Sequence, residues 1–194
     1  MADEDVSILS PLSRTSLTVI QGASPKEQIL EACRRDNVEL FHEVLKDMSG
    51  KKSKEEIAEF FNTATDTMGN HLLHVCANYG AYDVMDELLN VEYLECDPLT
   101  RRDKETPIHC AVRYANEREV ELGEAMAKML IDAGGDPRVK DGHGRKPAEL
   151  CTPRTEELRS ILIREEYALN EGLKHADMQP EDEDGGAGSA SDSE

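Results

Sequence analysis

The chain has 194 residues, of which 38 % are hydrophobic and 32 % charged, a balance typical of a folded domain with a sizeable core. It carries 41 acidic and 22 basic residues, and the net charge of −19 argues against binding to a nucleic-acid backbone. With no Trp, three Phe and five Tyr, the core must consist mainly of aliphatic residues, which suits stacked short helices.

The sequence shows no sign of a membrane or secretory protein. No apolar run approaches the 18 residues of a transmembrane helix, and the start Met-Ala-Asp-Glu-Asp lacks the apolar core of a signal peptide. The five cysteines are scattered and odd in number, which favours reduced thiols. We therefore expect a cytoplasmic or nuclear location, or both.

The first helical pattern follows an N-terminal arm, residues 1–23, which is expected to be extended over the first helices or disordered. At Ser24-Pro25 a helix can begin, with Ser as cap, Pro in the first turn and Glu27 completing a capping box. Apolar residues spaced three and four apart predict two helices within residues 25–48. Residues 49–65, with a Ser-Gly-Lys-Lys break and a short amphipathic stretch, are interpreted as an insertion.

Two further helix pairs follow. Residues 66–90 contain a hairpin tip, the motif His71-Leu72-Leu73-His74 and Gly80 as the turn between the helices. Residues 103–135 contain the clearest pattern, which opens with Thr106-Pro107-Ile108-His109 and ends at Gly134-Gly135. About seven extra residues within 115–124 are expected to separate the two helices of this pair.

The C-terminal part has a weaker pattern. Residues 141–170 begin with the turn Asp-Gly-His-Gly, restart a helix at Lys146-Pro147 and predict a less regular pair of helices. Residues 173–194 have no helical period, and their last 18 residues carry seven acidic and no basic side chains. Such a segment buries too little apolar surface to fold, so a disordered acidic tail is predicted after a domain of residues 24–172.

The motifs Thr-Pro-Ile-His at 106–109, Met-Leu-Ile-Asp-Ala-Gly-Gly-Asp-Pro at 129–137 and Asp-Gly-His-Gly at 141–144 closely resemble the ankyrin repeat. His74 and His109 are 35 residues apart, close to the 33-residue period of that family. The resemblance implies an all-α solenoid of about four helix-pair repeats joined by hairpin loops. Among ankyrin proteins, the chain is similar to the small single-domain kind found in fungi and other eukaryotes.

The resemblance implies a non-enzymatic scaffold or adaptor that binds another protein. Ankyrin repeats usually bind through hairpin tips and the exposed side of each first helix, the concave face. Arg and Tyr, which are common among interface hot spots, are frequent at these positions although the protein is acidic. The candidate partner-binding residues are Arg34, Arg35, Asn78, Tyr79, Arg102, Lys104, Arg113, Tyr114, His143 and Arg145. The alternative is a solvated face without a partner.

Histidine and cysteine residues are interpreted as scaffold. The resemblance implies that His74 and His109 form hydrogen bonds to the neighbouring repeat, and their spacing to cysteines does not match a zinc site. His109 and Cys110 are adjacent on one helix and point about 100° apart, so they cannot readily form a nucleophile–base pair. We expect no catalytic residue, metal or cofactor. A small metal- or thiol-dependent enzyme is the least favoured reading.

Two occupants fit the concave face: an acidic or phosphorylated segment of another protein, or the chain's own tail. Ser189 and Ser191 each have an acidic residue three positions on, the pattern of an acid-directed kinase site. The alternative function is an acidic chaperone or escort for a basic client such as a ribosomal protein or histone. We expect a monomer with a protein partner, and no direct contact with nucleic acid or membrane.

Overall fold

The computed structural model describes the backbone of residues 22–176 and the side chains of residues 22–172. The predictions for the N-terminal arm up to residue 21 and for the acidic tail from residue 177 therefore lie outside the described residues. The described chain is helical, which confirms the predicted all-α stack. Its elements are α1 (Pro25–Arg35), α2 (Val38–Ser49), α3 (Lys54–Thr63), α4 (Leu72–Tyr79), α5 (Tyr82–Leu89), α6 (Pro107–Glu117), α7 (Val120–Asp132), the 3₁₀ turns η1 (Pro147–Leu150) and η2 (Pro153–Thr155), and α8 (Glu156–Ala176).

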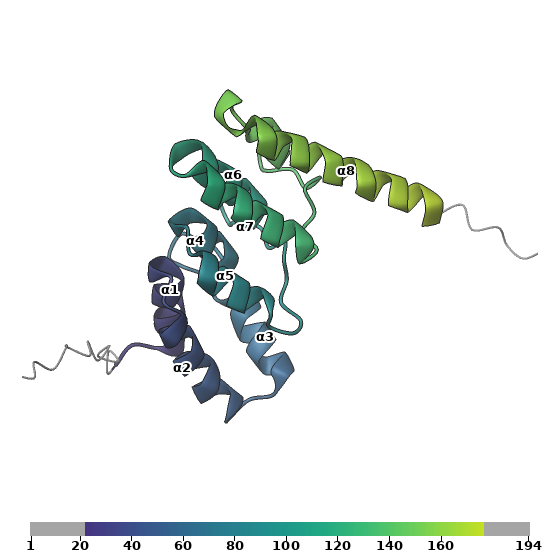
Figure 1. The fold of residues 1–194 in the computed structure, drawn as a ribbon. Helices are drawn as coiled ribbons and strands as arrows, with labels where there is room; N and C mark the ends of the chain where they lie inside the picture. Colours follow the sequence, from purple (N-terminus) through teal and green to yellow (C-terminus); the bar gives the residue numbers. More distant parts are fainter. Residues whose placement is uncertain (1–21, 177–194) are drawn as a thin grey trace, which may run out of the picture.

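The helices form two rows. In the inner row α1, α4 and α6 pack side by side, and in the outer row α2, α5 and α7 do the same (Figure 1). Each inner helix also packs against the outer helix that follows it, so every repeat buries its apolar face between its own partner and its neighbours. The inner helices carry the hairpin tips at their N-terminal ends, which places all tips on one side of the stack.

One core runs through the whole stack. The largest fully buried side chains come from both rows and include Phe41, Leu72, Met85, Ile108 and Leu130. Phe41 of α2 stacks on Phe61 of α3 with ring centroids 5.9 Å apart, which fixes the inserted helix to the first repeat. Full burial of a side chain of this size contributes roughly 1.5–3 kcal/mol, so the core rests on aliphatic burial as composition predicted.

The helix start at Ser24 is confirmed. The Glu27 amide donates to Ser24 Oγ at 3.3 Å, and the Glu27 carboxylate accepts from the Ser24 amide at 2.8 Å, which closes the capping box. This exchange satisfies two backbone N–H groups that a helix end otherwise leaves without partners.

The bridging role of the two histidines is also confirmed. His74 Nε2 donates to the Glu105 carbonyl at 2.8 Å, and His109 Nε2 donates to the Arg145 carbonyl at 3.1 Å. Because a carbonyl can only accept, Nε2 carries the proton in both rings and Nδ1 is an acceptor. Each histidine thus ties an inner helix to the hairpin of the next repeat.

The insertion forms the short amphipathic helix α3. Ile57 and Phe61 are buried, and Asn62 near its end links three segments. The Asn62 side chain donates to the Tyr93 carbonyl at 3.0 Å and accepts from the Glu95 amide at 2.9 Å. Its backbone carbonyl accepts from His71 Nδ1 at 2.8 Å. The inserted helix is therefore joined to the loop after α5 and to the start of α4.

Residues 115–124 do not separate the third pair of helices, contrary to the prediction. They lengthen both, because α6 has 11 residues and α7 has 13, whereas α4 and α5 have eight each. Only Arg118 and Glu119 lie between the two helices. A side chain on Gly123 would meet the Cβ atom of Ala115 at 2.5 Å, so the absence of one lets α6 and α7 approach closely here.

The last repeat also departs from the prediction of two helices. Its first helix is replaced by the turns η1 and η2, because Pro147 and Pro153 are only six residues apart and proline cannot continue an α-helix. Its second helix, α8, has 21 residues and continues through Gly172 to Ala176, past the predicted end of the domain. Glycine inside a helix reduces its stability by only about 1 kcal/mol relative to alanine, so Gly172 does not end α8.

Candidate functional site

The hairpin tips stack on one another into a continuous surface, here called the hairpin ridge (residues 66–70, 99–104 and 140–145). The Arg101 amide donates to the Gly69 carbonyl at 3.2 Å, and the Gly142 amide donates to the Asp103 carbonyl at 2.6 Å. A Cβ atom on Gly142 would lie 2.8 Å from that same carbonyl oxygen. The tips therefore form a preorganised surface rather than independent loops.

The first and the last of the three tips are each built around an aspartate. Asp141 Oδ1 accepts from the amides of His143 and Arg145 at 2.8 and 2.9 Å, and Oδ2 accepts from the Arg145 guanidinium. Burial of the Asp141 carboxyl raises its pKa, but these hydrogen bonds from Arg145 and His143 outweigh burial and lower it to about 2. Asp66 accepts from the amides of Met68 and Asn70 in the same way. Both carboxylates are thus engaged inside their own turns.

The charges that remain free on the ridge are mostly positive. Arg101, Arg102, Lys104 and Lys140 are exposed, and none of them forms an ion pair within residues 22–176. Asp103 is the one carboxylate of the ridge that is not held in its own turn. The predicted residues Arg102, Lys104, His143 and Arg145 all lie on this surface, with Arg145 partly neutralised by Asp141 at 2.8 Å.

The predicted residues on the inner helices are in more varied surroundings. Arg34 and Arg35 both pair with Glu31, Asn78 is half-buried near the Cys110 thiol, and Tyr79 is 53 % exposed. Tyr79 is therefore an exposed aromatic ring available to a partner, and the Arg35 side chain is 73 % exposed despite its ion pair.

Arg113 and Tyr114 are engaged within the fold. Arg113 forms an ion pair with Glu105, whose side chain is only 10 % exposed and whose carbonyl receives the hydrogen bond from His74. Tyr114 is half-buried against Gly80, which has φ of +76° and no room for a side chain beside the Tyr114 ring. The Arg118 guanidinium lies 5.7 Å from the centroid of that ring. Tyr114 thus packs against the preceding repeat, whereas Arg113 is held by Glu105 within its own repeat.

Sequence reasoning missed two apolar residues beside the ridge cations. Met68 is 67 % exposed at the tip of the first described hairpin, and Leu99 is 42 % exposed where the second hairpin begins. An apolar residue inside the turn sequence Asp-Thr-Met-Gly-Asn was a signal that could have identified Met68. The ridge therefore offers apolar side chains next to positive charges.

Two buried thiols, Cys76 and Cys110, and two buried imidazoles, His74 and His109, have unreactive surroundings. Burial raises the pKa of the Cys110 thiol to about 12 and that of Cys76 well above its usual value. Burial lowers the pKa of His74 to about 4 and that of His109 below its ordinary value. Within residues 22–176 no three His, Cys, Asp or Glu side chains form a group that could hold a metal ion.

None of the helices within the described residues has the length and apolar character needed to cross a membrane.

Comparison with known proteins agrees with this architecture. Residues 103–142 match the ankyrin-repeat family profile. An ankyrin repeat-containing protein of Saccharomyces cerevisiae is 37 % identical over 152 residues, which cover 77 % of this chain and 82 % of the yeast protein. Zinc finger CCCH domain-containing protein 56 of Arabidopsis thaliana is 29 % identical over 106 residues, which span 52 % of this chain but only 14 % of that longer protein. Zinc finger CCCH domain-containing protein 29 of the same plant is 26 % identical over 112 residues, which span 58 % of this chain and 18 % of that protein.

The stacked helix pairs, the histidine bridges between repeats and the similarity over most of the yeast relative place the chain in the ankyrin-repeat family. Ankyrin repeats generally mediate protein–protein interactions and are typically non-enzymatic.

Proposed function

We propose that the protein is a non-enzymatic interaction module that binds an acidic or phosphorylated segment of another protein along the hairpin ridge. The supporting observation is the set of exposed ridge cations, Arg101, Arg102, Lys104 and Lys140, that have no ion-pair partner in the described part of the chain. Guanidinium and ammonium groups in such an arrangement bind carboxylates and phosphates through charge-assisted hydrogen bonds. Met68 and Leu99 supply apolar contact beside them.

The test is a comparison of partners captured by the intact chain and by the triple variant Arg101→Ala, Arg102→Ala, Lys104→Ala. Lys26→Ala, Lys46→Ala, Lys51→Ala is the matched control, because it removes three exposed cations without ion pairs from α1, α2 and the turn after α2. Partners lost with the ridge variant but kept with the control support the proposal. If both variants retain the same partners, the ridge is not the binding surface.

Arg113 and Tyr114 are unsuitable for this test because both are engaged within the fold, Arg113 with Glu105 of its own repeat and Tyr114 with Gly80 of the preceding one. Tyr79→Ala tests instead whether the partner extends onto the concave face. This substitution removes a rigid, exposed aromatic ring, so it should weaken binding by roughly 1–2 kcal/mol if the partner reaches the inner row.

The acidic tail is proposed to compete for the same ridge. Any unstructured chain of 18 residues spans on the order of 25 Å. The tail follows α8, which contacts the segment of the last hairpin through Arg138–Asn170 at 3.2 Å and Lys146–Glu166. Phosphate on Ser189 or Ser191 would add charge and strengthen this competition. Deletion of residues 177–194 should then tighten binding of an acidic partner at low salt. Unchanged affinity would remove the tail from the mechanism.

A further inference from the structure

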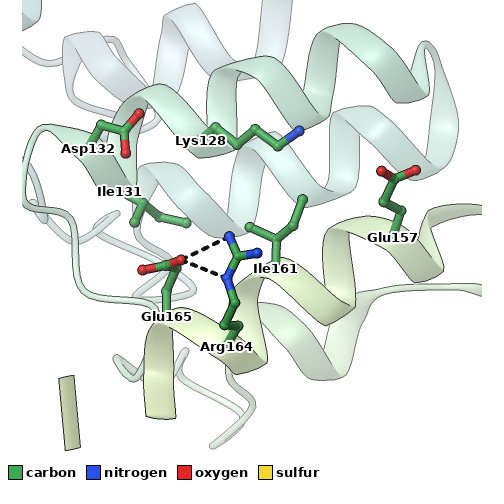
Figure 2. A pocket seen from close by; sticks show the side chains of 7 residues that line it. All are labelled: Lys128, Ile131, Asp132, Glu157, Ile161, Arg164 and Glu165. Carbon is green, nitrogen blue, oxygen red and sulfur yellow. Dashed lines mark hydrogen bonds and ion pairs between the residues drawn. The ribbon is translucent and has the colours of Figure 1, made fainter. Parts of the chain in front are cut away.

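The outer row of helices has two grooves on its surface, on the far side of the helices from the core. The groove between α7 and α8 has a volume of about 390 Å³ and is lined by Ile131 of α7 and Ile161 of α8, with the Arg164 guanidinium drawn between them in Figure 2. The groove between α5 and α7 has a volume of about 510 Å³ and is lined by Leu89 and Met129, among others. Lys128 and Asp132 of α7 border both grooves, so the two form one band across the outer face.

The irregular last repeat explains why the α7–α8 groove is open. Because η1 and η2 replace the first helix of that repeat, α8 is held mainly through them rather than through α7. Leu158 and Leu162 of α8 are fully buried in this contact. Ile161 on the adjacent flank is only half-buried and lines the groove together with the half-buried Ile131 and the exposed Arg164 side chain.

The rim of this band is acidic. Asp86, Asp132 and Glu157 border the grooves and form no ion pair within residues 22–176. Arg164 is already paired with Glu165 at 3.1 Å, which leaves Lys128 as the rim cation without an acidic partner in the described chain. The exposed carboxylates of the outer helices, such as Asp83 and Glu121, extend the negative potential around the band.

We propose that this band is a second docking surface, which binds a basic amphipathic segment of a partner protein. A large aliphatic side chain of the segment packs against Ile131 and Ile161 beside the Arg164 side chain, and its Lys or Arg residues reach Asp132 and Glu157. The acidic tail of the chain itself does not fit this surface, because its charge has the same sign as the rim. The proposal is independent of the hairpin ridge, since the band lies on the outer helices.

The experiment uses the full chain labelled with ¹⁵N and a synthetic helix-forming peptide with Leu on one face and Lys on the flanks. The same peptide with Glu in place of Lys is the control ligand. We expect the Lys peptide to bind with a Kd on the order of 10–100 µM at low salt and to shift the amide signals of Ile131 and Ile161. The Glu peptide should not bind.

Three variants separate this groove from general attraction to an acidic protein. Asp132→Lys reverses a rim charge in the last turn of α7, where a cation also suits the helix dipole, and should weaken binding at least about fivefold. Ile161→Ser should weaken it without a change of charge. Glu43→Lys makes the same reversal on α2, away from the grooves, and should change the Kd less than about twofold.

Failure of the Lys peptide to bind, or equal weakening by Asp132→Lys and Glu43→Lys, would overturn the proposal. Sedimentation of the chain without peptide provides a further check. A dimer that Asp132→Lys dissociates would assign the band to a second copy and would also overturn it.

Discussion

At the scale of single residues, His74 and His109 occupy equivalent positions in two repeats but differ in the hydrogen bonding of Nδ1. His109 Nδ1 lies 2.8 Å from Thr106 Oγ1, a hydroxyl that can donate to it. The residue three positions before His74 is His71, whose own Nδ1 donates to Asn62, so His74 Nδ1 is buried without a hydrogen-bond partner among the described residues. A buried acceptor left without a donor costs roughly 1–3 kcal/mol.

His71→Thr should therefore be more stable than His71→Ala by about 1 kcal/mol, because both variants lose the hydrogen bond to Asn62 but the threonine hydroxyl can donate to His74 Nδ1 as Thr106 does to His109. Urea unfolding of the two variants measures this difference. His71→Ala is the control, since it loses the hydrogen bond to Asn62 without supplying a hydroxyl, and it should destabilise the protein. If Thr is no better than Ala at this position, the missing hydrogen bond at Nδ1 is not a source of instability.

The stability of the fold should fall as the pH decreases from about 6.5 towards 4. Burial lowers the pKa of His74 to about 4, and burial lowers that of His109 as well, so in this window the unfolded chain binds protons that the folded chain does not. The His74 contribution is fully present above pH 6.5 and amounts to roughly 3 kcal/mol lost by pH 4.

Unfolding free energies at pH 7, 6 and 5 check this dependence. Asp141, whose pKa is about 2, loses its contribution only below about pH 4, so it does not interfere. His74→Gln keeps an N–H for the Glu105 carbonyl but does not titrate, and its stability should change less with pH. A profile as steep as that of the unaltered chain would contradict the role assigned to His74.

At the scale of elements, the longest helix pair depends on one close approach. Gly123 of α7 lies so near Ala115 of α6 that an added Cβ atom would also come within 2.6 Å of the Ala115 amide nitrogen. The extra residues of this repeat lengthened two packed helices instead of forming a loop, because the small residues at the crossing allow the helices to continue in contact. The third repeat is therefore the one with the most extensive internal packing.

Gly123→Ala should destabilise the protein by about 1–3 kcal/mol, although alanine favours helix, because overpacking against the α6 backbone outweighs propensity. Gly172→Ala is the matched control in α8, where nothing lies within 4 Å of an added Cβ atom, and it should be neutral or stabilise by up to about 1 kcal/mol. Thermal unfolding of the two variants measures the difference, and a stabilising Gly123→Ala would contradict the close approach.

Ile108 and Leu88 lie in the centre of the stack and are fully buried. Truncation of either to alanine should cost roughly 2–5 kcal/mol, because it removes apolar contact and leaves a cavity that a packed interior only partly closes. Denaturant unfolding measures the loss. A cost below about 1 kcal/mol would indicate that the neighbouring helices collapse into the space.

At the scale of the whole molecule, charge is divided between two faces. The hairpin ridge has exposed cations, whereas the outer helices α2, α5 and α7 are rich in carboxylates. Such a division does not change the net charge of −19, but it presents opposite potentials to different partners. The two proposed surfaces would let one small protein hold an acidic and a basic segment at the same time.

Because most of this charge is negative and exposed, self-repulsion should limit stability at low ionic strength. Raising NaCl from 10 to 300 mM reduces the Debye length from about 30 to about 6 Å and should raise the melting temperature by a few degrees. Thermal unfolding at constant pH measures the effect. A melting temperature that falls with salt would show that ion pairs such as Arg113–Glu105 contribute more than the repulsion costs.

Local signals in the sequence were sufficient for much of the fold. The capping box at Ser24, the apolar spacing around Ile108 and the two bridging histidines each specify a local geometry that the stack then repeats. The same register placed Arg102, Lys104 and His143 on the hairpin tips. The capping box and the apolar spacing depend on residues close together in the chain, so the sequence alone determined them. The histidine bridges reach carbonyls 31 and 36 residues away and were predicted from the resemblance to the ankyrin repeat.

Tertiary packing decided the rest. Arg113 is not free because it pairs with Glu105, and Tyr114 is half-buried because it packs against Gly80 in the preceding repeat. Helical periodicity predicts neither contact. Likewise, the groove between α7 and α8 exists because two 3₁₀ turns replaced a helix and left Ile161 beside Ile131. The sequence alone determined the repeat and its register, whereas tertiary contacts within and between repeats decided which side chains remain available to a partner.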